Sequence, residues 1–280
     1  MVSAQKKGLI EKGATIWKAG GGYTFTEGPA TAPDGRVFFT DQPNDQIYIW
    51  DEEKGISLYL EGTGRSNGMY FNNDGRLVAC ADEHNQLIVF SENKKMNVIF
   101  NGQYEGKHIN GPNDLWITPG GGIYFSDPYY HRAWWPESHK QAQDVRGVYY
   151  LPPDGKIKRV IDDFKQPNGL VGTPDGKILY VADINDRKTW KYDIQPDGTL
   201  ANKTLFAPDG SDGMTIDNSG NIYLTSQKVL VYSPAGELFE EIEVPEAPSN
   251  VCFGGKKRNI LFVTARTSVY ILRMNVKGVN

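Results

Sequence analysis

Several classes of protein are excluded by what this chain lacks. No apolar run approaches the length needed to cross a bilayer, so the sequence predicts no transmembrane helix. The formal net charge is −4 and indicates no basic surface, so neither nucleic acid nor a membrane is expected as a partner. Hydrophobic residues make up 39% of the chain and charged residues 23%, which is the composition of a soluble globular protein.

Cysteine is scarce. The two cysteines, Cys80 and Cys252, lie far apart and are flanked by apolar residues, so we expect buried free thiols rather than a disulfide or a pair of ligands. The N-terminal segment also lacks the apolar core of a signal peptide. The sequence as it stands therefore predicts a cytoplasmic protein, with a periplasmic or secreted location as the alternative if a signal peptide has been removed.

Familiar catalytic and nucleotide-binding motifs are absent as well. No Gly-x-Ser-x-Gly elbow occurs, so nucleophilic serine catalysis is not predicted. The glycine runs 20–22 and 120–122 precede no helical pattern and are predicted as turns rather than as phosphate-binding loops. His84 follows Cys80 closely, but the thiol lies in a strand-like run and the imidazole in the turn after it, so no catalytic pair is predicted.

What the chain does contain is a dense pattern of short strands and turns. Glycine (31) and proline (16) are abundant, and Asp-Gly pairs, which favour hairpin turns, recur at 34–35, 74–75, 154–155, 175–176, 197–198 and 209–210. Between them lie short runs rich in Val, Ile, Tyr, Phe and Thr, while long stretches with helical spacing are absent. The pattern predicts an all-β protein.

The strands follow one scheme that recurs six times. Each copy has a polar residue, a short apolar strand, a turn and a second apolar strand. The polar residues, called the anchor residues below, are Glu27, Asn67, Asn113, Asn168, Asp212 and Asn250. They are 38 to 55 positions apart, close to the roughly 40–50 residues of a four-stranded propeller blade. We therefore predict a single six-bladed β-propeller over residues 1–280. Residues 14–18 are expected to complete the sixth blade and close the ring, leaving no open sheet edge.

The longest step between anchor residues carries an insertion, residues 128–147. Long loops in a compact domain are usually either functional or disordered. We expect this one to cover one end of the ring. Its aromatic side chains are expected either to stack on a sugar ring or to pack the loop onto the blades; they are Tyr129, Tyr130, Trp134 and Trp135.

The anchor residues occupy equivalent points of six inner strands, so a propeller would bring them together on its axis. Buried carboxylates and amides are costly unless they are paired. Their oxygens suit a hard divalent cation, with Ca²⁺ the first choice and Mg²⁺ or Mn²⁺ as alternatives, whereas zinc would favour His or Cys. The competing interpretation is that each residue only caps a strand or turn, as Asp34, Asp74 and Asp175 are expected to do. Six polar residues in register, two of them acidic, favour the cation site.

These motifs resemble the SMP-30/gluconolactonase/LRE-like family of six-bladed calcium propellers over nearly the whole chain. The resemblance rests on TEGP at 26–29, SNGM at 66–69, GKHINGPNDL at 106–115, IYFSDPYY at 123–130, PNGL at 167–170 and SDGM at 211–214. It implies a divalent metal held by Glu27, Asn113, Asn168 and Asp212. It also implies hydrolysis of a sugar-derived or similar lactone, with Asp212 as the acid/base residue.

The resemblance further implies that the stretch 113–114 and the loop after residue 125 contact the substrate. In and near these segments we predict His108, Asn113, Asp127 and Tyr129 as substrate-binding residues. His108 stands where members of the family often carry an arginine, so substrate selectivity is expected to differ. Asp127 has a second interpretation, in which it only caps the turn that follows it.

Hydrolysis of a lactone requires that a water be deprotonated and that the ring oxygen be protonated, while a cation polarises the carbonyl. Asp212 is the best candidate for moving these protons, with His108 and His131 as alternatives because imidazole titrates near neutrality. Asp114 points away from Asn113 along an alternating strand. It is expected to brace the channel wall or a second, structural cation.

Three functions remain open from the sequence. The first is a metal-dependent lactonase acting on a small lactone or sugar-like molecule. The second keeps the metal site but hydrolyses another ester, an organophosphate or a modified sugar. The third is a non-catalytic propeller that serves as a binding platform, which predicts no metal and no loss of rate in Asp212→Asn. A monomer or weak homo-oligomer is expected in each case.

Overall fold

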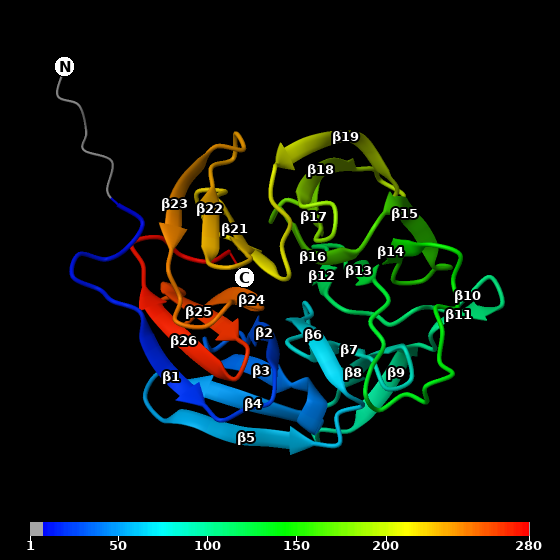
Figure 1. The fold of residues 1–280 in the computed structure, drawn as a ribbon, viewed down its shortest axis with the longest axis horizontal. Coiled ribbons are helices and arrows are strands. Elements are labelled where there is room, and N and C mark those ends of the chain that lie inside the picture. Colours follow the sequence, from blue (N-terminus) through cyan, green and yellow to red (C-terminus); the bar gives the residue numbers. More distant parts are fainter. Residues whose placement is uncertain (1–7, 280) are drawn as a thin grey trace.

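The computed structural model describes residues 8–279 and arranges them as a ring of six four-stranded antiparallel sheets (Figure 1). Outside the sheets, the described residues form only one short 3-10 turn, η1 (Gln42–Asn44), and one two-stranded hairpin, β10 (Gln103–Tyr104) with β11 (Lys107–His108). The all-β, six-bladed propeller predicted from the repeats is confirmed. No helix in this part of the chain is long and apolar enough to cross a membrane.

The first three blades follow the chain in order. Blade 1 contains β2 (Thr26–Thr31), β3 (Val37–Asp41), β4 (Gln46–Asp51) and β5 (Gly55–Glu61). Blade 2 contains β6 (Ser66–Phe71), β7 (Leu77–Ala81), β8 (Gln86–Phe90) and β9 (Met96–Phe100). Blade 3 contains β12 (Leu115–Ile117), β13 (Ile123–Asp127), β14 (Arg146–Leu151) and β15 (Lys158–Phe164).

The other three blades complete the circle. Blade 4 contains β16 (Pro167–Gly172), β17 (Ile178–Asp183), β18 (Lys188–Ile194) and β19 (Leu200–Ala207). Blade 5 contains β20 (Met214–Ile216), β21 (Ile222–Thr225), β22 (Val229–Tyr232) and β23 (Leu238–Ile242). Blade 6 contains β24 (Asn250–Gly254), β25 (Ile260–Ala265), β26 (Ser268–Arg273) and β1 (Trp17–Gly21). The first strands, β2, β6, β12, β16, β20 and β24, contact one another around the ring and are therefore the inner strands.

The N-terminal strand closes the ring, as predicted, but with shifted bounds. β1 pairs antiparallel with β26, and Trp17 lies opposite Ile271. The strand was predicted over residues 14–18, with the glycines after it in a turn. Gly20 lies inside the strand instead, opposite Val269 of β26, and a Cβ there would come within 2.5 Å of Ile56 Cδ1 on the outer strand of blade 1. The glycine permits a close approach between the first and last blades.

The predicted hairpin turns are mostly present. Gly35, Gly75, Gly176 and Gly198 all have positive φ, between 70° and 93°, as a tight Asp-Gly turn requires. The pair Asp209-Gly210 is an exception, because it lies in the connection from β19 to β20 and lines a cavity rather than closing a hairpin.

The sheets pack face to face through apolar side chains that alternate along the strands. At the interface of blades 3 and 4, a Cβ on Gly172 would lie only 2.3 Å from Cη2 of Trp116, so the indole ring packs directly against the backbone of Gly172. Cys80 and Cys252 are both buried and free, as predicted. The core thus fills the spaces between blades and leaves the axis to polar side chains.

Candidate active site

The anchor residues meet near the axis although they come from blades distant in the chain. Asn250 Nδ2 donates to Glu27 Oε2 at 2.9 Å, and these residues are 223 positions apart. Asn168 Nδ2 donates to Asp212 Oδ1 at 2.7 Å. Glu27, Asp212 and Asn113 line one cavity. The structure therefore brings together the four side chains for which a metal-binding role is predicted.

The glycine that follows four of the anchor residues makes this convergence sterically allowed. A Cβ on Gly213 would lie 1.9 Å from Asn250 Cγ, and one on Gly28 would lie 1.9 Å from the carbonyl oxygen of Asn67. A Cβ on Gly68 or on Gly169 would lie 2.5 Å from the backbone carbonyl oxygen of the next anchor residue in the chain. At these four positions the polar-Gly motif is therefore a packing requirement, since a side chain there would push the next anchor away from the axis.

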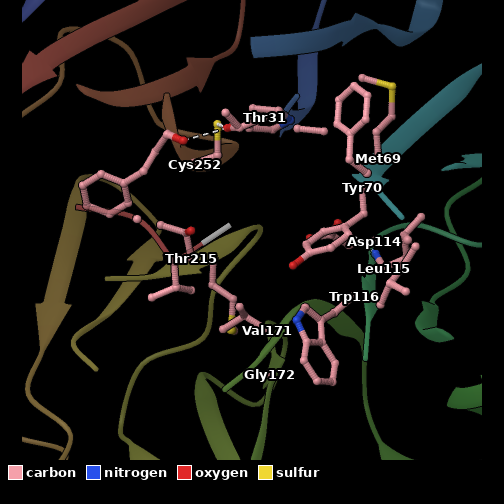
Figure 2. A pocket seen from close by; sticks show the side chains of 18 of the residues that line it. Thr31, Met69, Tyr70, Asp114, Leu115, Trp116, Val171, Gly172, Thr215 and Cys252 are labelled. Atoms are coloured by element: carbon pink, nitrogen blue, oxygen red, sulfur yellow. Dashed lines mark hydrogen bonds between the residues drawn. The ribbon is translucent and has the colours of Figure 1, made fainter. Parts of the chain in front are cut away.

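Two cavities flank the anchor residues. The first, of about 710 Å³, is lined by residues that precede the inner strands and by loops between second and third strands, among them Tyr130 and Arg132. We call it the anchor cavity. The second, of about 410 Å³, is lined by residues further along the inner strands, including Tyr70, Trp116 and Asp114 (Figure 2). The acidic anchor residues line only the first, so it is the candidate active site.

Burial perturbs the carboxyl groups near the axis. It raises the pKa of Asp212 to about 6 and that of Asp114 to about 7. The pKa of Glu27 is raised well above its usual value, first by burial and then by the negative charges of Asp212 and Asp114. Carboxylates that repel one another in a desolvated place are costly to ionise together. A divalent cation would reverse that cost.

The donor set fits a hard divalent cation. Glu27 and Asp212 supply carboxylate oxygens, while Asn113 and Asn168 supply amide oxygens, the ligand types that Ca²⁺ prefers. Asn168 Oδ1 is buried and has no hydrogen-bond partner among residues 8–279, so it is an acceptor whose bonding is unmet. Within that range no three or more His, Cys, Asp or Glu side chains are grouped to hold a metal, so such a site would depend on its two amides.

Three of the four residues predicted to bind substrate do not line the anchor cavity; Asn113 does. His108 is exposed on the β10–β11 hairpin. Tyr129 donates its O–H to a carbonyl of its own insertion loop. Asp127 is fully buried, and its two oxygens accept backbone N–H groups of residues 110–111 at 2.9 and 2.7 Å. This geometry favours a bracing role for Asp127 over contact with a ligand.

Arg132 lines the cavity and was not predicted as a site residue, whereas Tyr130, which also lines it, is one of the loop aromatics expected either to stack on a sugar ring or to pack the loop onto the blades. Asn168 Nδ2 donates to the Tyr130 hydroxyl at 3.0 Å, which joins the insertion to an anchor residue. Arg132 pairs through Nε with the buried carboxylate of Asp82 and so ties the same loop to blade 2. His131 faces a neighbouring groove rather than the anchor cavity. A single arginine in an irregular insertion has no periodic signal by which the sequence could single it out.

Comparison with known proteins agrees with this architecture. A family model described as the SMP-30/Gluconolactonase/LRE-like region matches residues 25–267. This chain belongs to the SMP-30/gluconolactonase/LRE-like family. The match covers all six inner strands, and it confirms the resemblance that the TEGP, PNGL and SDGM motifs indicated.

Similar proteins align with most of the length of this chain. A gluconolactonase from Zymomonas mobilis is 29% identical over 91% of this chain and 80% of its own. The solved structure of a gluconolactonase from Xanthomonas campestris is 27% identical, with a TM-score of 0.87 over 95% of this chain and 91% of that one. Diisopropyl-fluorophosphatase from Loligo vulgaris is 26% identical over 70% of this chain and 67% of its own.

Proposed function

We propose that this protein hydrolyses a sugar-derived lactone in the anchor cavity, with a divalent cation held by Glu27, Asn113, Asn168 and Asp212. Its family and its gluconolactonase relatives make the chain a hydrolase of the lactonase type. The observation that carries the finer proposal is the meeting of two carboxylates and two amides, from four blades, beside a cavity of about 710 Å³. Calcium is the first candidate, because the donors are all oxygens.

The chain's own residues would position the substrate and move its protons. When bound, the cation supplies Lewis-acid polarisation of a carbonyl oxygen. Asp212 accepts the Asn168 amide on Oδ1, which leaves Oδ2 free to hold a proton. Asp212 lines the anchor cavity, so its carboxylate can exchange a proton with a molecule bound there. Asp212 would take a proton from the attacking water and return it to the ring oxygen as the acyl C–O bond breaks. Tyr130 would cover the substrate from the insertion side.

Metal analysis combined with lactone hydrolysis tests the proposal. We expect purified wild type to bind one divalent ion per chain and to lose activity on chelation. Glu27→Gln should lose both the ion and the turnover, because it removes one of the two carboxylates. Asp74→Asn is the matched control, since Asp74 lies in an exposed turn and pairs with Arg76. A wild type that hydrolyses lactones equally well after complete removal of metal would contradict the proposal.

A second candidate is hydrolysis of a phosphoester or organophosphate at the same place. It is favoured by the similarity to diisopropyl-fluorophosphatase. The two candidates differ in the bond that breaks, an acyl C–O bond in one and a phosphorus bond in the other. A panel of small lactones, aryl esters and a fluorophosphate, assayed with one enzyme preparation, would separate them.

A further inference from the structure

Arginines from three blades line the anchor cavity. The loops between second and third strands carry Arg132 in blade 3, Arg187 in blade 4 and Arg266 in blade 6. These blades are spread around the ring, so the guanidinium groups approach the cavity from different sides. We propose that the cavity selects a lactone that also carries an anionic group, a carboxylate or a phosphate. This inference rests on the proposed lactonase function.

Arg187 is available for such a group because its acidic neighbour is already paired. Asp186 accepts from Lys165 and Lys188, one on each carboxylate oxygen. Arg187 itself is exposed and forms no ion pair with any other residue in the described range 8–279. An unpaired guanidinium beside a cavity can bind a carboxylate or phosphate through two parallel N–H groups.

Arg266 is available for the same reason. Glu246, on the loop that precedes blade 6, is engaged by other side chains: its oxygens accept hydrogen bonds from Thr267, Ser268 and Tyr270, and Lys18 Nζ lies 3.7 Å from Oε1. Arg266 is exposed and forms no ion pair within the part of the chain that the structure describes. Because Arg266 lines the cavity, its guanidinium is available to a ligand there.

The other charged side chains at the cavity do not fully cancel the positive charges of Arg187 and Arg266. Arg132 is partly buried and pairs with Asp82, so its guanidinium is held in place and is not free to bind a ligand's anionic group. Among the described residues that line the cavity, Asp209 is the one acidic side chain besides Glu27 and Asp212, and it accepts the O–H of Tyr232. The floor carboxylates of Glu27 and Asp212 would be balanced by a divalent cation. Arg187 and Arg266 then supply two positive charges against the one negative charge of Asp209, so the cavity keeps a net positive charge.

Comparison among the blades shows that arginine is not what the turn itself requires. Asp45 in blade 1 and Asn85 in blade 2 occupy the corresponding loops with φ of 57° and 55°, and both residue types tolerate this left-handed conformation. Blades 4 and 6 place Arg187 and Arg266 in the same conformation, with φ of 53° and 47°. Arg65 and Arg258 adopt the same conformation with φ of 56° and 57° and do not line the anchor cavity, so these turns tolerate arginine, and it is the place of Arg187 and Arg266 at the cavity that supports their proposed role.

Paired kinetics on matched substrates test the inference. The substrates are a neutral gluconolactone and the same lactone bearing either a phosphate or a carboxylate at its far end. We expect kcat/KM to be at least about tenfold higher for one of the anionic lactones, about 1.4 kcal/mol, and we expect added salt to narrow the difference. The phosphate and carboxylate arms identify which anion is preferred.

The double variant Arg187→Gln/Arg266→Gln should lower the anionic-to-neutral ratio of kcat/KM by at least about tenfold. The double variant Arg36→Gln/Arg76→Gln is the control, because these arginines pair with acidic residues in exposed turns, and it should leave the ratio unchanged. Equal kcat/KM for neutral and anionic lactones in wild type would overturn the inference. So would a ratio that the Arg187/Arg266 variant does not alter.

Binding measurements keep this test separate from the proposed function. If wild type hydrolyses none of the lactones, the lactonase proposal fails, and calorimetry with a sugar phosphate, a sugar acid and the neutral sugar then tests the arginines alone. Tighter binding of either anion, lost in Arg187→Gln/Arg266→Gln but kept in the control variant, would support the arginine assignment. Equal binding of charged and neutral sugars would overturn it.

Discussion

Replacing Glu246 by glutamine tests how the cavity rim is fastened to blade 6. Glu246 directly precedes residues 247–249, which line the anchor cavity. Its carboxylate accepts the Thr267 N–H at 3.0 Å, the Thr267 hydroxyl at 2.9 Å and the Tyr270 hydroxyl at 2.9 Å, and it also accepts the Ser268 hydroxyl. The substitution keeps the size of the side chain but removes the charge that these donors stabilise.

The size of the effect follows from the pKa of Glu246. Burial opposes ionisation, but hydrogen bonds from Ser268, Thr267 and Tyr270 outweigh it and lower the pKa from 4.5 to about 2. A pKa lowered this far corresponds to roughly 3 kcal/mol of stability at neutral pH. The side chain is 25% exposed, so we expect roughly 2 kcal/mol after solvent screening. Because the folded-state pKa is depressed, this stability is present above pH 4.5 and is lost as the pH falls towards 2.

Urea unfolding of wild type and Glu246→Gln at pH 7 and pH 3 measures the difference directly. We expect the variant to lose roughly 2 kcal/mol at pH 7 and clearly less at pH 3. Glu243→Gln is the control, since Glu243 is 78% exposed and pairs only with Lys228, and it should change stability by less than about 0.5 kcal/mol. An equal loss at both pH values, or a loss no larger than that of the control, would refute the reasoning.

Three other predictions concern the axis, the insertion and the cation. Gly213→Ala places a Cβ against Asn250 and should cost about 1–3 kcal/mol in urea unfolding, so unchanged stability would argue against the tight packing of the anchors. Asp82→Ala leaves Arg132 unpaired and should speed limited proteolysis within residues 128–145, whereas an unchanged cleavage rate would show that the ion pair does not hold the loop. Ca²⁺ at a hundred times its Kd should stabilise wild type by about 2.7 kcal/mol in thermal unfolding, and a melting temperature indifferent to Ca²⁺ would count against the site.

The ring could be predicted because its determinants are local and repeated. Asp-Gly turns and short apolar runs act within a few residues, and six copies reinforce one another. The error in the closing strand has a different origin. Gly20 belongs to a strand because it pairs with Val269 of β26 at the other end of the chain, a contact that no local pattern contains.

The anchor residues were recognisable for the same reason as the blades, since each occupies one point of a repeat. The residues around them were not. Arg187 and Arg266 differ in sequence context, and Arg132 lies in an irregular insertion, so no period connects them. His108 and Tyr129 are near the anchor residues in sequence but point elsewhere in the fold.

By itself the amino-acid sequence determined the number of blades, the order of strands and the polar character of the axis, because these follow from short-range propensities repeated along the chain. Only the tertiary structure decided which loops border the cavity and which carboxylates there are already paired. The physical reason is that the charge balance at a cavity is set by distances between side chains from separate blades. Asp186 and Glu246 illustrate this, since other side chains engage both carboxylates and neither forms an ion pair with Arg187 or Arg266 in the described part of the chain.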